Sequence, residues 1–230
     1  MTGVRFSHDG QKIVSSSGDK SVRIWDADTD RTVTERQGHR KYVTSVCWSS
    51  DEKQVVSGSG DGTVCVWARE RGLSGTGGDL VRTLCGHTKF VYSVSASADG
   101  VRIASGSGDN TVRVWDSRTG EMLLVLDKHE DYVYSVNFSY DGKFIVSGSV
   151  DRSIRVSNAI SGEEHLVIPN AHSGSIYCVC FSPDCTRIAS ASSDRSASVW
   201  DANTGTKLGS FYGHSASVYS VRFPISTLAT

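Results

Sequence analysis

Residues 86–116 read GHTKFVYSVSASADGVRIASGSGDNTVRVWD, and variants of this stretch recur along the chain. Four other segments align with its central part without gaps, and each carries an aspartate after a serine-rich run. The five aspartates are Asp19, Asp61, Asp109, Asp151 and Asp194, at steps of 42, 48, 42 and 43 residues. A fixed period of about 20–50 residues is typical of propellers, solenoids and other repeat arrays. The sequence therefore predicts five consecutive copies of one structural unit.

Apolar and polar residues alternate within each unit, as in Val133–Phe138, which reads VYSVNF. A period of two residues indicates β-strands, and no sustained helical period is present. In the fourth unit the expected strands are Val133–Ser139, Phe144–Ser149, Ser153–Ser157 and His165–Ile168. The Gly-rich stretch Arg69–Asp79, which lengthens one step to 48 residues, is expected to be a flexible loop. The fold class is therefore all-β.

Charge and cysteine content argue against several kinds of ligand. Of 230 residues, 24 are Lys or Arg and 25 are Asp or Glu, for a formal net charge of −1. The longest basic run is Arg40-Lys41, so no electrostatic footprint for nucleic acid is present. The six cysteines lack metal-site spacing, and we expect no metal and no cofactor.

Hydropathy and the first residues bear on location. No apolar stretch approaches the roughly 20 residues that span a bilayer, and residues 1–5 hold no signal-peptide core. We therefore expect a cytoplasmic protein without membrane association.

Four units place a histidine 18 residues before a serine, with an aspartate four residues after that serine. These residue types form the triad of serine hydrolases. A catalyst needs one such site with an oxyanion hole, whereas four equivalent triads would be spread over this chain. We therefore predict that the protein is not an enzyme and has no catalytic residue.

The recurring motifs are Gly-His, Val-x-Ser-Val-x-Phe-Ser, Asp-Gly, Ala-Ser-Gly-Ser-x-Asp and Thr-Val-Arg-Val-Trp-Asp. Gly86–Asp116 shows them nearly whole, with Ala96 in place of the Phe. In these motifs essentially the entire chain resembles the WD-repeat family. The resemblance implies a β-propeller of four-stranded antiparallel blades around a central channel, with five repeats and one extra C-terminal strand. Val4–Gly10 and Val22–Asp26 are also similar to the repeat arrays of fungal NACHT-type receptors.

In that family the tryptophan, serine, histidine and aspartate of a repeat form a structural network, and the resemblance implies the same role here. A buried indole, hydroxyl or imidazole costs about 1–3 kcal/mol if left unpaired. The role falls on Ser15, Asp19, Trp25, His39, Ser57, Asp61, Trp67, His87, Ser105, Asp109, Trp115, His129, Ser147, Asp151, His172, Ser190, Asp194, Trp200 and His214. Ser157 stands where the fourth unit should have Trp, so that blade is expected to be the least stable.

The family resemblance also implies that the first strand of each blade is innermost, so the residue after its first Val or Ile lies near the channel mouth. That position holds Thr44, Tyr92, Tyr134, Tyr177 and Tyr219. Tyrosine is enriched at binding hot spots, so these residues predict a partner-binding face. The alternative is that the rings only plug the channel.

The expected function is a non-catalytic scaffold that binds a peptide or protein segment on this face. One alternative is a ligand-sensing or autoinhibitory repeat domain of a larger signalling ATPase. Nucleic-acid or chromatin binding is a further, less favoured, alternative.

The ends of the chain pose the question of how the ring closes. We expect one domain over 1–230, with repeats at approximately 1–37, 38–85, 86–127, 128–170 and 171–212 and a closing strand at 213–224. Val4-Arg5-Phe6-Ser7 is only half of a first strand, and Val221-Arg222-Phe223 duplicates most of it. One expectation is that the C-terminal strand docks beside Lys12–Ser17 and that His214 completes the first network, giving five blades. The alternative is an open arc of a larger, seven-bladed ring, or a strand-exchanged oligomer.

Overall fold

The computed structural model describes residues 3–69 and 80–224, in which every regular element is a β-strand. The strands form five antiparallel sheets of four consecutive strands, here called blades 1 to 5. Blade 1 contains β1 (Gly3–Phe6), β2 (Lys12–Ser16), β3 (Ser21–Asp26) and β4 (Thr32–Gln37). Blade 2 contains β5 (Val43–Trp48), β6 (Gln54–Ser59), β7 (Val64–Ala68) and β8 (Leu80–Leu84), and blade 3 contains β9 (Val91–Ala96), β10 (Arg102–Ser107), β11 (Val112–Asp116) and β12 (Met122–Leu126). Blade 4 contains β13 (Val133–Phe138), β14 (Phe144–Ser149), β15 (Ile154–Asn158) and β16 (Glu164–Ile168), and blade 5 contains β17 (Ile176–Phe181), β18 (Arg187–Ser192), β19 (Ala197–Asp201) and β20 (Lys207–Phe211).

The predicted all-β fold with five four-stranded antiparallel blades is confirmed. In blade 4 the observed strands agree with the expected ones to within one residue at each end. Of the expected loop at Arg69–Asp79, residues 70–79 lie outside the described part of the chain. Within the described ranges, no helix is long and apolar enough to cross a membrane.

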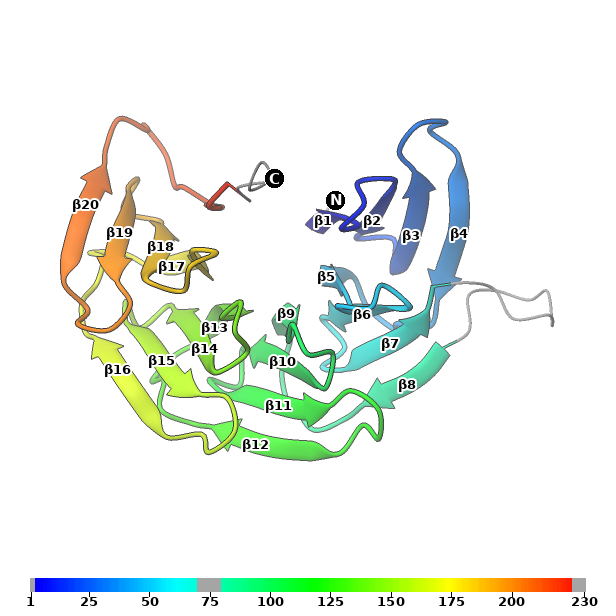
Figure 1. Cartoon of the computed structure of the whole chain (residues 1–230), viewed down its shortest axis with the longest axis horizontal. Coiled ribbons are helices and arrows are strands. Elements are labelled where there is room, and N and C mark those ends of the chain that lie inside the picture. Colours follow the sequence, from blue (N-terminus) through cyan, green and yellow to red (C-terminus); the bar gives the residue numbers. More distant parts are fainter. Residues whose placement is uncertain (1–2, 70–79, 225–230) are drawn as a thin grey trace.

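The blades follow one another along an arc, with the first strand of each blade innermost and the fourth outermost (Figure 1). The arc is open between blade 1 and blade 5, and β1 and residues 213–224 lie beside this opening (Figure 1). Among the described residues, no strand of blade 1 pairs with a strand of blade 5.

The hydrophobic core lies between neighbouring blades and not within them. Between blades 2 and 3, for example, Val56 and Val64 of one blade pack with Val91, Val94 and Ile103 of the next. The Ser-Gly-Ser motif permits this approach, because a β-carbon on Gly58 would lie only 2.7 Å from Val91 Cγ1. Each blade thus buries its apolar faces only when it has a neighbour on both sides.

One expectation was that the C-terminal segment pairs with β2 and so closes the ring. The structure does not show this pairing. The place beside β2 is taken by β1, which pairs from Gly3↔Ser16 to Phe6↔Ile13. A short turn joins β1 to β2, so this local pairing costs less loop-closure entropy than bringing in a strand from the far end of the chain. Residues 213–224 instead lie against blade 5, where Val218 N donates to Ser192 O at 3.0 Å. His214 is exposed and lies outside the hydrogen-bond network of blade 1.

Candidate functional site

The channel mouth carries a cluster of tyrosines from successive blades. Its cavity has a volume of about 340 Å³ and is lined by Tyr42, Thr44, Tyr92, Tyr134, Tyr177 and Tyr219. The five residues that the family resemblance placed at the channel mouth are therefore brought together, and Tyr42 joins them. Here the six lining residues together with Phe90 and Tyr132 are called the tyrosine array.

A β-bulge turns four of these side chains toward the channel. In β13 the pairing with β14 passes from Val133↔Ser149 to Ser135↔Gly148, so Tyr134 has no partner across the ladder. Thr44, Tyr92 and Tyr177 fall at the same shift of register in their own blades. A bulge leaves one residue unpaired and re-aims its side chain, which explains why one sequence position repeatedly supplies the channel mouth.

The rings of the tyrosine array form a continuous chain of contacts. Ring centroids are 4.8 Å apart for Tyr92 and Tyr134, 5.4 Å for Tyr134 and Tyr177, and 5.0 Å for Tyr177 and Tyr219. These separations lie in the range of favourable aromatic pairs. Thr44 interrupts the tyrosines in blade 2, where its hydroxyl donates to Gly58 O at 2.8 Å.

The array extends outward through residues that the sequence analysis did not select. Tyr42 contacts Phe90 at 5.7 Å, Phe90 contacts Tyr92 at 6.3 Å, and Tyr132 lies 6.2 Å from Tyr92. Tyr42, Phe90 and Tyr132 each stand directly before the first Val of the innermost strand, and this shared position is the signal that could have found them. Lys41 lies over Phe90 and Lys89 over Tyr132, at 5.1 and 5.2 Å, so cations border the rings.

The rings are only partly covered and their hydroxyls are available. Tyr92, Tyr134 and Tyr177 are half-buried and Tyr219 is exposed, and no tyrosine hydroxyl of the array hydrogen-bonds within the described residues. Burial raises the pKa of Tyr92 and of Tyr134 above the ordinary value, with neighbouring tyrosines adding to the effect. Both phenols therefore stay protonated at neutral pH and can donate a hydrogen bond to a ligand.

A second constellation, here called the buried network, lies inside the blades. In blade 2, Trp67 Nε1 donates to Ser57 Oγ at 2.8 Å, and that hydroxyl lies 2.8 Å from His39 Nε2. His39 Nδ1 lies 3.1 Å from Asp61 Oδ2. Because an ionised carboxylate only accepts, Nδ1 carries the proton and Nε2 accepts from the serine. The chain of donors thus runs from Trp through Ser and His to Asp.

The same geometry recurs in blades 3 and 5. His87 lies 2.8 Å from Ser105 and 2.9 Å from Asp109, and His172 lies 2.7 Å from Ser190 and 2.8 Å from Asp194. Trp115 and Trp200 donate to the two serines at 2.9 and 2.8 Å.

The aspartates also hold turns together. Asp61 accepts the backbone N–H of Arg40 at 2.8 Å and both the N–H and hydroxyl of Thr63, at 2.9 and 2.6 Å. Burial alone would raise the pKa of Asp61, but these hydrogen bonds outweigh it and lower the pKa to about 2. Burial lowers the pKa of His39, against the opposing effect of Asp61, so the imidazole is held neutral.

The serines of this network are poorly placed to act as nucleophiles. Ser57, Ser105 and Ser190 are each 0% exposed. Each hydroxyl already hydrogen-bonds a tryptophan and a histidine. A substrate carbonyl has no access to such an oxygen. Across residues 3–69 and 80–224, no group of three or more His, Cys, Asp or Glu side chains could hold a metal ion.

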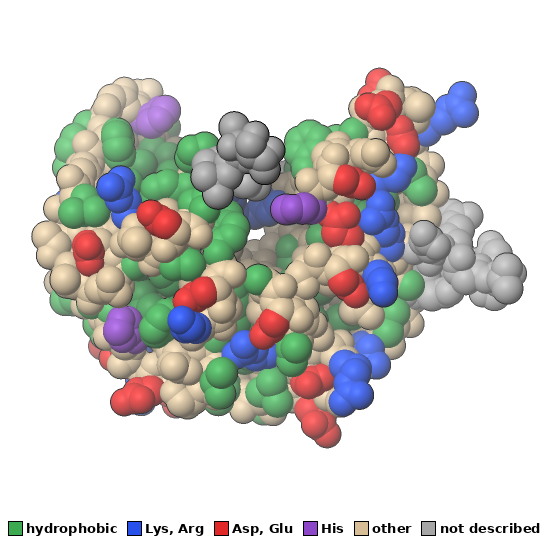
Figure 2. Space-filling view, in the orientation of Figure 1, with side chains coloured by type: hydrophobic (Ala, Val, Ile, Leu, Met, Phe, Trp, Pro, Cys, Tyr) green, Lys and Arg blue, Asp and Glu red, His purple; other side chains and the backbone are tan. Residues whose placement is uncertain are grey.

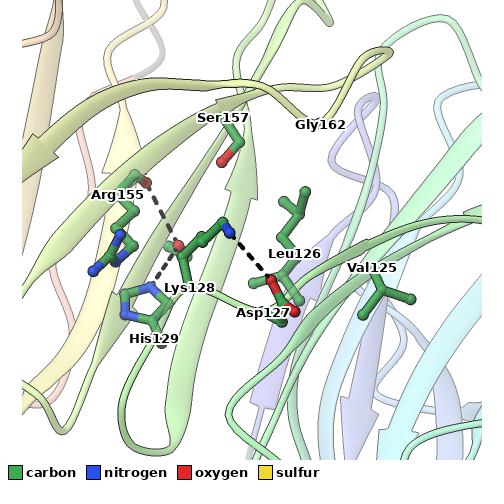
Figure 3. Close-up of a pocket in the computed structure, with 10 residues that line it drawn as sticks. Val125, Leu126, Asp127, Lys128, His129, Arg155, Ser157 and Gly162 are labelled. Atoms are coloured by element: carbon green, nitrogen blue, oxygen red, sulfur yellow. Dashed lines mark hydrogen bonds and ion pairs between the residues drawn. The ribbon is translucent and has the colours of Figure 1, made fainter.

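Blade 4 keeps its histidine but lacks the indole. His129 lies 2.8 Å from both Ser147 and Asp151, while Ser157 replaces the tryptophan. A hollow of about 50 Å³ remains, bordered by Ser157, Lys128 and Leu126 (Figure 3). Lys128 stands where blades 2 and 3 have Gly38 and Gly86, whose missing β-carbons make room for the indole.

Blade 1 has the opposite defect. Trp25 Nε1 donates to Ser15 Oγ at 2.8 Å, and Asp19 binds the hydroxyl of Ser21 at 2.6 Å. In the described part of the chain, no histidine contacts this serine or this aspartate, so the network ends at Ser15. Blades 1 and 4 are thus incomplete in complementary ways.

Comparison with known proteins gives one family. The family model described as "WD domain, G-beta repeat" (WD40) matches residues 1–26, 30–68, 78–116, 120–157 and 163–201. No curated protein matches the chain.

Proposed function

Because this chain belongs to the WD40 repeat family, whose repeats generally act as protein-interaction scaffolds, we propose that it binds a peptide or protein segment at the tyrosine array. The family is typically non-enzymatic, which agrees with the burial of the network serines. The main observation behind this proposal is that partly covered tyrosines from different blades converge on one cavity of about 340 Å³. Within the described residues their hydroxyls make no hydrogen bond.

The chemistry of the array suits an extended segment. Tyrosine offers a large apolar ring at low entropic cost and a hydroxyl that can bond a peptide carbonyl or N–H. Bulges on adjoining strands set the rings at contact spacing along the channel mouth, so successive side chains of a ligand would meet successive rings. A single small polar ligand would not use this whole length.

A cytoplasmic location is part of the proposal. It is supported by the six cysteines, all of which are free thiols, the state that a reducing compartment maintains. Imaging of the fluorescently tagged chain tests it, and a secreted product would overturn it.

Selection from a random-peptide display library tests the binding site. We expect immobilised wild-type protein to enrich peptides that a Tyr92→Ala, Tyr134→Ala, Tyr177→Ala triple variant fails to retain. Tyr140→Ala is the matched control, because Tyr140 is exposed but lies in the turn at the other end of β13. Peptides retained equally by the triple variant would place the binding site elsewhere.

A further inference from the structure

The hollow of blade 4 lies where three other blades hold an indole. In blades 2, 3 and 5 the tryptophan ring packs against the network histidine, with ring centroids 6.0, 6.1 and 6.0 Å apart. Blade 4 has Ser157 at this position, and about 50 Å³ stays open. The other blades therefore show which group the space beside a network histidine accommodates, namely a planar aromatic ring with one N–H donor.

One wall of the hollow is apolar and lacks its cover. Leu126 of β12 pairs with Val112 just as Leu84 of β8 pairs with Val64, so the two leucines are equivalent. Leu84 is 3% exposed and packs in the same cluster as Trp115, whereas Leu126 is only partly buried and its cluster holds no tryptophan. Covering Leu126 would remove apolar surface from water, which favours an aromatic ligand over a polar one.

The hollow also holds a hydroxyl that lacks a donor. Ser147 Oγ donates to His129 Nε2 over 2.8 Å, but within the described residues no N–H or O–H donates to it. In blades 2, 3 and 5 the aligned hydroxyl accepts the indole N–H at 2.8, 2.9 and 2.8 Å. Ser147 is 5% exposed and its three counterparts are 0% exposed, so a small donor can reach it. A ligand that donates one hydrogen bond would satisfy this acceptor.

The charged side chains that line the hollow are each paired with a residue of opposite charge. Arg155 Nη1 lies 2.5 Å from Glu164 Oε2. Lys128 Nζ lies 3.7 Å from Asp127 Oδ1. Figure 2 likewise shows acidic and basic side chains interspersed over one face of the molecule. A neutral ligand therefore suits the hollow better than an ion.

Lys128 limits the room inside the hollow. A cavity that holds a benzene ring measures roughly 150 Å³, so a hollow of about 50 Å³ has to widen. Lys128 extends toward Asp127 (Figure 3), and an exposed ion pair of this kind holds a side chain only weakly. Ala171 has a β-carbon at the aligned position of blade 5 and packs in the same cluster as Trp200. Only the part of Lys128 beyond its β-carbon therefore has to turn toward solvent.

The ligand must also fit beside Ser157. Serine shares its β-carbon with tryptophan, and its hydroxyl stands on that carbon where the five-membered ring of an indole would be attached. A single six-membered ring with one O–H or N–H reproduces the outer ring and the donor of tryptophan without these atoms. The space therefore suits a phenol or an aniline better than a two-ring indole.

We propose that the hollow of blade 4 is a binding site for a small neutral molecule of the phenol or aniline type. The ring covers Leu126, and its O–H or N–H donates to Ser147 Oγ. Lys128 turns toward solvent to admit it. The ligand supplies the ring and the donor that blade 4 lacks, and because it binds the folded state it stabilises the protein.

Titration of the purified chain with phenol, followed by two-dimensional NMR, tests the proposal. We expect saturable shifts that are largest at the amides of Leu126, Lys128 and Ser157, and a melting temperature that rises with phenol concentration. Shifts confined to the tyrosine array, or no saturable shift, would overturn the site. N-acetyltyrosinamide carries the same ring on a peptide-like group. If it bound as tightly as phenol, the occupant would be a tyrosine side chain of a partner and not a small molecule.

Two variants with opposite effects locate the ligand. Ser157→Trp with Lys128→Gly fills the hollow and should abolish the phenol shifts, whereas Lys128→Ala opens it and should bind phenol several-fold more tightly. Lys143→Ala is the matched control, because Lys143 lies in the same blade and pairs in a similar way with Asp141, at 3.4 Å. Phenol binding that survives in the filled variant, or equal affinities of Lys128→Ala and Lys143→Ala, would contradict the proposal.

The hydrogen bond to Ser147 has its own test. Ser147→Ala should weaken phenol about fivefold, because the O–H loses its acceptor, and should leave the affinity for toluene, which has no donor, unchanged. A variant that weakens both ligands equally, or neither, would show that phenol does not donate to this serine.

Discussion

The buried network and the tyrosine array are both made by residues that recur at fixed positions of the repeat, yet they are opposite in physical character. In the complete networks every donor meets an acceptor, as in the step from Trp115 through Ser105 and His87 to Asp109. In the array the rings touch but the hydroxyls are unpaired within the described residues. Satisfied buried polar groups stabilise a fold, whereas partly covered aromatics with a free polar tip are suited to binding. Repetition alone therefore does not distinguish a structural role from a functional one.

The largest expected effect is the loss of an indole from a complete network. Trp115→Ala should lower the free energy of unfolding by about 3–5 kcal/mol, because it opens a cavity and leaves Ser105 without its donor. Urea denaturation measures this. Ser157→Ala at the aligned position of blade 4 is the control and should cost less than about 1 kcal/mol. Equal losses at the two positions would show that the indole contributes nothing specific.

A gain is expected from restoring the missing indole. The residue before the network histidine is small wherever the tryptophan is present, as with Gly38, Gly86 and Ala171. A β-carbon on Gly38 would lie only 2.9 Å from the ring of Trp67. The side chain of Lys128, at the aligned position of blade 4, is therefore expected to crowd an indole introduced at Ser157. We expect Ser157→Trp with Lys128→Gly to stabilise by about 1 kcal/mol, and Ser157→Trp alone to gain less. Additive single effects in thermal denaturation would refute this coupling.

Acidification should weaken the network in two steps. The folded-state pKa values of His39 and His172 are lowered by burial below 6.5, so their stabilising contribution is complete above pH 6.5 and declines below it. For Asp61 and Asp194, burial is outweighed by hydrogen bonds and the pKa falls from 3.8 to about 2, so their contribution declines as the pH falls from about 4 toward 2. The urea midpoint should therefore be flat from pH 7.5 to 8.5 and decrease below pH 6.5. A midpoint that rises on acidification would mean that the folded histidines take up protons.

The repeat period and the alternation of apolar residues were enough to predict the five blades and the strands of blade 4. The repeat aligned Thr44, Tyr92, Tyr134, Tyr177 and Tyr219 at one position, because residues at equal positions in a repeat occupy equal places in the fold. That this position lies at the channel mouth was implied by the resemblance to the WD-repeat family.

Other features could not be read from the sequence. The bulge at Tyr134 depends on how two strands pair, which residue types alone do not determine. The hollow beside Lys128 requires knowing that this residue faces the missing indole. One expectation about residues 213–224 was wrong. Residues 221–223 repeat residues 4–6 of β1, so the sequence alone does not decide which segment pairs with β2.

The most direct test of the account compares Tyr134→Ala with Asp109→Ala in two measurements, thermal or urea unfolding and calorimetric titration with a peptide selected by display. The account predicts that Tyr134→Ala loses about 2 kcal/mol or more of binding free energy with nearly unchanged stability. It predicts that Asp109→Ala loses about 1–3 kcal/mol of stability, because His87 and the turn N–H groups lose their acceptor, while the folded variant keeps its affinity. If instead Tyr134→Ala unfolds early and still binds, while Asp109→Ala stays stable and fails to bind, the two regions have been assigned the wrong roles.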